Sequence, residues 1–203
     1  MAIILATEFY EDNNYPSLEY ADRDGITMRE YFQSAFGLSD YQLLPSKPWQ
    51  MDGGPTLNDL INTFDPHQGD LRSRIINAKK YSGVEEIDVH IYYRGLGEWI
   101  DGAPYLIPKD AKFTRNVTKF SLDRFVKDLS ILSVINSIQT ITLFLDITFT
   151  NPKEAAGSVW EFPEVNDKIC ILSASSKGES SQLYPLKKPS LFLYSLLKGF
   201  PLY

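Results

Sequence analysis

Two apolar stretches decide the fold: DVHIYYRGLGEW (residues 88–99) and TITLFLDITFTN (residues 140–151). Each is rich in β-branched and aromatic residues, which is typical of a strand in a sheet. Each is expected to end at a glycine or polar turn. Because sites in open α/β sheets are built at the carboxyl ends of the central strands, we expect the functional residues at these two ends.

The rest of the chain alternates between short apolar runs and stretches with helical spacing. We expect strands over residues 2–9, 40–44, 87–93, 140–149 and 168–174, and helices over residues 20–36, 57–64, 70–81, 122–132 and 192–198. Asp101-Gly102, between two apolar runs, predicts a hairpin. This order predicts an α/β fold with an open, mostly parallel sheet that helices cover on both faces.

Composition narrows the class of protein. The chain has 203 residues, 43% of them hydrophobic, and a net charge of −6. Its length suits one domain with a substantial core, and its acidic balance disfavours a nucleic-acid partner. A single cysteine, Cys170, gives neither an intrachain disulfide nor a zinc set. No run is long enough for a membrane span, so we expect a cytoplasmic protein. We also expect neither a metal nor a cofactor.

The two strand ends carry short motifs, YYRGLGE (residues 92–98) and FLDITFTN (residues 144–151). The first resembles the Y-Y-S-G-H-G-E turn of the caspase and metacaspase family, and the second is similar to its L-D-x-C-x-S-G turn. The resemblance implies that the family's catalytic histidine falls at Leu96 and its cysteine nucleophile at Thr148. Both catalytic groups are replaced, and Arg94 stands where the family has serine.

Further matches to this family follow along the chain. LEYADRDG (residues 18–25) resembles the opening of its first helix, and residues 98–111 resemble its hairpin. Residues 175–182, which begin with Ser175, resemble the loop after its fifth strand. The resemblance implies a single caspase-haemoglobinase-type domain over residues 1–203. Its expected parts are a large-subunit-like part (1–150), a loop (151–166) and a small-subunit-like part (167–203).

The resemblance also implies a cleft for peptide. Gly97 and Thr148 would supply backbone N–H groups to a carbonyl oxygen, and Ser175 would lie in a loop beside them. In the metacaspase branch, the counterparts of Asp24 and Asp146 form an acidic pocket for a basic side chain. The residues alone give a simpler interpretation, with Asp24 as an acidic first-turn residue that favours the helix dipole and Asp146 as strand-end polarity. Whether the cleft binds peptide stays open.

The two replacements remove the chemistry of a cysteine–histidine peptidase. Leu96 has no lone pair to accept a proton, and the hydroxyl of Thr148 needs a base more than a thiol does. Losing one member of such a pair costs about four to six orders of magnitude in turnover. His90 is expected beneath the turn as a half-buried histidine, and His67 in a loop away from the cleft. Cys170 is interpreted as core filler.

These observations predict a catalytically inactive caspase-like pseudopeptidase that acts as a protein-binding or regulatory module. Its expected partner is a protein, such as an active caspase-family protease or a peptide segment. One alternative is a hydrolase that uses Thr148, with His90 as the best candidate for its base. Another is a structural domain of a larger assembly, in which Phe200–Tyr203 would dock onto a partner.

Overall fold

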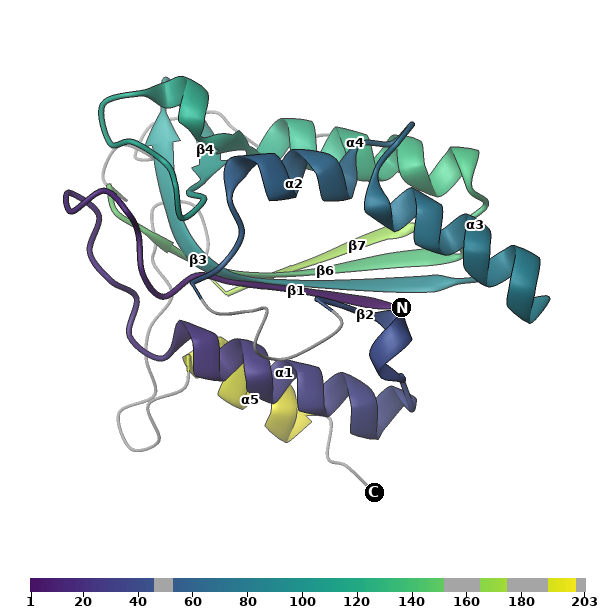
Figure 1. The fold of residues 1–203 in the computed structure, drawn as a ribbon. Helices are drawn as coiled ribbons and strands as arrows, with labels where there is room; N and C mark the ends of the chain where they lie inside the picture. Colours follow the sequence, from purple (N-terminus) through teal and green to yellow (C-terminus); the bar gives the residue numbers. More distant parts are fainter. Residues whose placement is uncertain (46–52, 152–164, 175–189, 200–203) are drawn as a thin grey trace.

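The computed structural model describes residues 1–45, 53–151, 165–174 and 190–199. A seven-stranded sheet lies between two layers of helices, with α1 and α5 on one face and α2, α3 and α4 on the other (Figure 1). The helices are α1 (Ala21–Phe36), α2 (Leu57–Phe64), α3 (Asp70–Ser82), α4 (Leu122–Ile135) and α5 (Leu191–Gly199), with 3₁₀ turns η1 (Asp40–Gln42) and η3 (Asn116–Thr118). The strands are β1 (Ala2–Ala6), β2 (Leu43–Leu44), β3 (Asp88–Ile100), β4 (Ala103–Leu106), β5 (Phe120–Ser121), β6 (Thr140–Phe149) and β7 (Ile169–Ser173).

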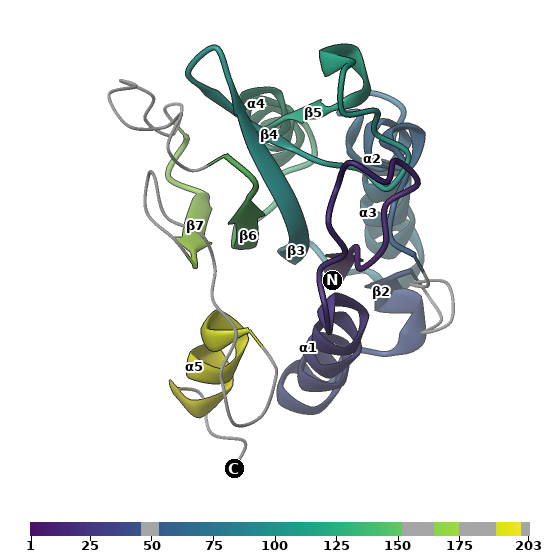
Figure 2. The same cartoon turned by 90° about the vertical axis from the view of Figure 1, so that its left-hand side faces the viewer.

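Five strands form the parallel part of the sheet, in the order β2-β1-β3-β6-β7 (Figure 2). β4 and β5 are antiparallel additions that follow β3 through the hairpin at Asp101 and Gly102, both with positive φ (50° and 80°). The α/β class and the mostly parallel sheet are thus confirmed. Of the described helices, none has the length and apolar content that a membrane crossing requires.

The expected helices form, and capping residues explain several of their ends. The Thr56 hydroxyl accepts a hydrogen bond from the N–H of Asp59 (3.1 Å), and the Ser121 hydroxyl accepts one from the N–H of Arg124 (3.3 Å). Gly37 follows α1 and Gly83 follows α3, each in the left-handed region that glycine adopts without a Cβ penalty.

Several predictions about the strands need correction. The strand expected over residues 2–9 ends at Ala6. β3 does not stop at a turn near Gly95 but runs on to Ile100, because β4 takes over as its partner where β1 ends. Residues 40–44 form a 3₁₀ turn before a strand of only two residues. Cys170 is exposed and not core filler, because β7 pairs with β6 alone among the described strands.

Alternation along β3 sorts its side chains between two apolar clusters. Ile91 and Tyr93 pack in the larger cluster beneath α2, α3 and α4, whereas Tyr92 packs with Phe32 of α1 and Leu193 of α5. Arg94 and Leu96 continue the Tyr92 face toward the carboxyl end of β3. This alternation brings Arg94 and Leu96 to the face covered by α1.

Candidate functional site

The two positions to which the resemblance assigns a catalytic pair are neighbours at the carboxyl end of the sheet. Leu96 on β3 and Thr148 on β6 are register partners in the parallel ladder. Leu96 is 1% exposed and packs in an apolar cluster with Leu18 and Ile107. Its main-chain N–H donates to the hydroxyl of Tyr10 (2.7 Å). The side chain opposite Thr148 is therefore apolar and buried.

Arg94 links the polar groups of this region. Its Nη1 donates to Asp146 Oδ1 (3.3 Å) and to the hydroxyl of Thr148 (3.2 Å), and its Nε lies 3.4 Å from Asp24 Oδ2. Arg94, Asp24 and Asp146 are buried, with at most 1% of each residue exposed. We call these three residues the arginine cluster. They form a buried ionic group directly beneath Thr148.

Asp24 also contacts the start of α5. Its Oδ2 accepts a hydrogen bond from the N–H of Ser190 (3.0 Å), and the Ser190 hydroxyl accepts one from the N–H of Leu193 in the first turn of α5 (3.0 Å). Burial raises the pKa of Asp24 to about 6, although the Ser190 N–H and Arg94 oppose this shift. Asp24 lies in the first turn of α1, as the residues alone indicate, but it is buried and also contacts Arg94 on β3 and Ser190 before α5.

The charges of the arginine cluster do not balance. Asp24 and Asp146 bring two carboxylates to one guanidinium, and the Tyr92 hydroxyl supplies a neutral donor to Asp146 Oδ2 (3.3 Å). The two acids thus come together as the resemblance implies, but Arg94 already stands between them. Sequence reasoning missed this role of Arg94. The available signal was an arginine in the place of a small serine, within an apolar strand.

Gly97 lies within the sheet and not in a free turn. It pairs with Phe149 on β6 and with Leu106 on β4, and its carbonyl accepts a hydrogen bond from the N–H of Thr150 (2.9 Å). A Cβ at this position would lie 2.5 Å from Ile147 Cγ2, so close packing requires glycine here. Gly97 and Thr148, which are expected to supply backbone N–H groups to a carbonyl oxygen, both belong to the ladder between β3 and β6.

The other residues considered for chemistry lie elsewhere. His90 is opposite Thr142 in the ladder, six residues before Thr148, which is about 20 Å along a strand. It stacks on Phe32 (5.6 Å between ring centroids), and burial lowers its pKa. His67 is exposed in the turn after α2. Ser175 and Phe200–Tyr203 lie outside the described residues.

Within the described part of the chain, no cluster of histidine, cysteine, aspartate and glutamate side chains could hold a metal ion.

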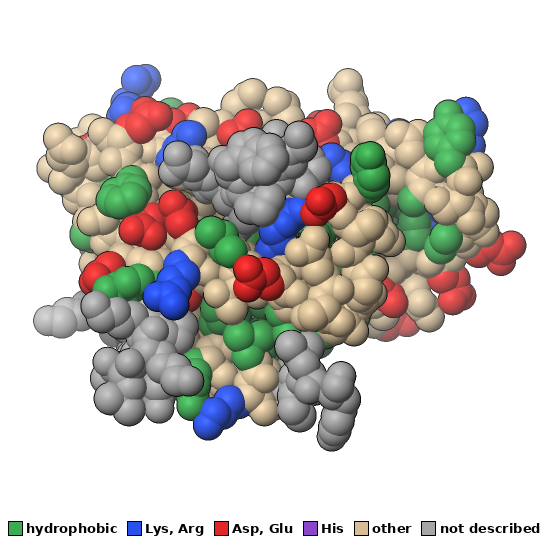
Figure 3. All heavy atoms as spheres, turned by 60° about the horizontal axis from the view of Figure 1, so that its bottom comes forward, with side chains coloured by type: hydrophobic (Ala, Val, Ile, Leu, Met, Phe, Trp, Pro, Cys, Tyr) green, Lys and Arg blue, Asp and Glu red, His purple; other side chains and the backbone are tan. Residues whose placement is uncertain are grey.

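Hydrophobic, acidic and basic side chains are interspersed on the face that carries α1 and α5 (Figure 3). The candidate site consists of the arginine cluster together with Leu96 and Thr148, which lie above it.

Comparison with known proteins returned neither a matching family model nor a matching curated protein.

Proposed function

We propose that this chain is a catalytically inactive caspase-like pseudopeptidase that acts as a protein-binding or regulatory module. The observation that carries the proposal is the ladder pair of Leu96 and Thr148 above the arginine cluster. A hydroxyl becomes a nucleophile when a neighbouring base takes its proton. Leu96 cannot accept a proton, and Arg94, which contacts the Thr148 hydroxyl, has no acceptor atom.

The arginine cluster also defines how such a module would bind its partner. A basic side chain that entered between Asp24 and Asp146 would have to displace Arg94, whose guanidinium already contacts both acids. Displacement would move a buried cation away from its partners, which is costly. The partner would instead contact the surface at the carboxyl end of β6, where Thr148 is half-buried. The partner class that the resemblance implies is an active protease of the caspase fold.

The test is the effect of this chain on the peptidase rate of an active caspase-fold protease from the same genome. We expect the chain to change that rate in a saturable manner. A Thr148→Arg variant should abolish the change in rate, because it places a long charged side chain on this surface. Val134→Arg is the matched control, since Val134 is 65% exposed on α4. No effect of the native chain, or equal loss in both variants, would refute the proposal.

A further inference from the structure

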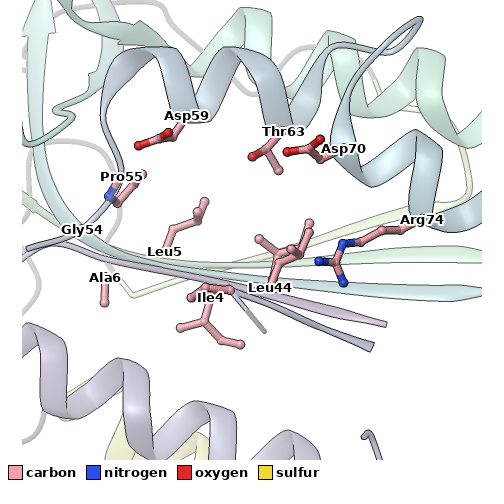
Figure 4. A pocket seen from close by; sticks show the side chains of 12 residues that line it. Ile4, Leu5, Ala6, Leu44, Gly54, Pro55, Asp59, Thr63, Asp70 and Arg74 are labelled. Atoms are coloured by element: carbon pink, nitrogen blue, oxygen red, sulfur yellow. The ribbon is translucent and has the colours of Figure 1, made fainter. Parts of the chain in front are cut away.

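A cavity of about 430 Å³ opens at the β1 edge of the sheet, between the strands and the helices α2 and α3 (Figure 4). It exists because β2 is short. β2 pairs only with Ala2 and Ile3, so β1 continues beyond its partner. The chain leaves the sheet edge at Pro45 and returns to it at Gly54. None of the residues that line the cavity belongs to the arginine cluster.

One end of this cavity is closed where two segments of the chain pack unusually close to each other. Gly54 has φ +75°, and a Cβ there would lie 2.3 Å from Thr7 Oγ1 and 2.6 Å from the carbonyl oxygen of Ala6. Only glycine allows this contact. Leu5 and Leu44 contribute apolar lining. The result is a half-open pocket at the sheet edge, with an apolar floor formed by Leu5 and Leu44.

Charged side chains from the helices line the opposite wall. Asp59 on α2 lies toward Gly54 and Pro55, Asp70 lies beside Thr63 at the start of α3, and Arg74 reaches toward Leu44 (Figure 4). The charges are thus spread along the pocket, with two carboxylates and one guanidinium that formally sum to −1.

Two of these groups are held in place by contacts within the chain. Asp59 Oδ2 accepts hydrogen bonds from the N–H of Thr56 (2.9 Å) and from its hydroxyl (2.7 Å). Arg74 Nη1 donates to the carbonyl oxygen of Tyr41 (2.9 Å). The positions of the two charges are therefore fixed before any ligand binds, which lowers the entropic cost of binding.

We propose that this pocket binds a free basic amino acid, arginine or lysine. Such a ligand carries two cationic groups and one carboxylate, which complement Asp59, Asp70 and Arg74 charge for charge. Its aliphatic stem matches the apolar floor formed by Leu5 and Leu44. The cavity volume falls within the range of small-molecule sites, roughly 300 to 1,000 Å³.

Other ligand classes fit these groups less well. A phosphate-bearing ligand would bring negative charge beside two carboxylates. A purely apolar ligand would cover the three charged groups without adding a partner of opposite charge to any of them, which costs free energy. A ligand without a carboxylate would leave Arg74 without a partner of opposite charge in the pocket. The charges that line the pocket therefore favour a ligand that carries two cationic groups and one carboxylate, with a net charge of +1.

The test is calorimetric titration of the full chain at constant ionic strength with four ligands. These are L-arginine, L-lysine, L-citrulline, which lacks the side-chain charge, and agmatine, which lacks the carboxylate. We expect arginine or lysine to bind about tenfold or more tightly than citrulline and agmatine, as expected when one charged hydrogen-bonding group is lost. Arg74→Gln should remove the advantage of arginine over agmatine.

Variants separate the pocket from the rest of the surface. Asp70→Asn should weaken arginine binding about tenfold, and Thr63→Trp should abolish it by filling the cavity. Asp123→Asn is the matched control, because Asp123 is also a first-turn acid, on α4. Circular dichroism checks that each variant folds, and the ligand series on the native chain needs no variant. Absence of binding, equal affinity for citrulline, or an equal effect of Asp123→Asn would overturn the proposal.

Discussion

Replacing Arg94 by methionine will lower the free energy of unfolding by about 3–5 kcal/mol, because it leaves two carboxylates buried without their cation. Asp24 and Asp146 are 1% and 0% exposed, so water cannot take the place of the guanidinium without rearrangement. The measurement is urea denaturation at pH 7. The matched control is Arg124→Met, which removes a pair between the exposed Arg124 and the half-buried Asp128 (3.4 Å) and should cost less than about 1 kcal/mol.

A rescue experiment attributes this loss to charge and not to volume. Adding Asp24→Asn and Asp146→Asn to the Arg94→Met variant removes both uncompensated carboxylates, and should recover a large part of the lost stability. The three sites share one network, so the effects of the single substitutions will not add. An Arg94→Met variant as stable as Arg124→Met would show that the arginine cluster does not hold this part of the fold together.

The second large effect is a dependence of stability on pH that comes from Asp24. Burial raises the pKa of Asp24 from 3.8 in the unfolded chain to about 6 in the folded one. Between these values the folded chain binds a proton that the unfolded chain does not bind. The free energy of unfolding therefore rises as pH falls from 6 to 4, by about 3 kcal/mol for a shift of roughly two units. Above pH 6 this contribution is lost.

The effect is measured as a difference between the native chain and Asp24→Asn at each pH. Other titrating groups, including His90 with its lowered pKa, are present in both chains and largely cancel. We expect the native chain to gain stability relative to Asp24→Asn as pH falls from 7 to 4. Arg94, Asp146 and Tyr92, which interact electrostatically with Asp24, are present in both chains. A difference that is flat, or that shrinks at low pH, would contradict the burial of an ionised Asp24.

The sequence predicted the layered fold because local signals agree with the tertiary structure. The helices α1 to α5 have clear apolar spacing, and glycine or hydroxyl residues such as Gly37, Thr56 and Ser121 mark several of their ends. The hairpin after β3 follows from Asp101-Gly102 and its positive φ angles. These features depend on neighbours within a few residues, so they can be read from the sequence.

The parts that the sequence did not predict depend on partners distant in the chain. β3 continues past Gly95 because β4 pairs with it, which no local turn signal indicates. Cys170 is exposed because of the position of β7 in the sheet, although its apolar neighbours resemble a core strand. Asp24 and Arg94 are separated by 69 intervening residues in the printed sequence, and only the packing of α1 against β3 joins them.

The resemblance placed Leu96 beside Thr148, and the ladder between β3 and β6 has the same pair. The resemblance also placed Asp24 near Asp146, and both contact Arg94. A motif comparison by residue type treats Arg94 as one mismatch among several. The physical consequence of that mismatch, a cation between the two acids, requires side-chain geometry.

The most direct test of the claim that Thr148 is not a nucleophile is intact-mass spectrometry. The chain is incubated with electrophilic peptide probes that carry basic or acidic P1 side chains. The Cys170→Ser variant is used, so that the exposed thiol does not react. We predict an unchanged mass, because neither Leu96 nor Arg94 can take the proton of the Thr148 hydroxyl. A stoichiometric adduct that maps to Thr148, and that disappears in a Thr148→Val variant, would contradict the account.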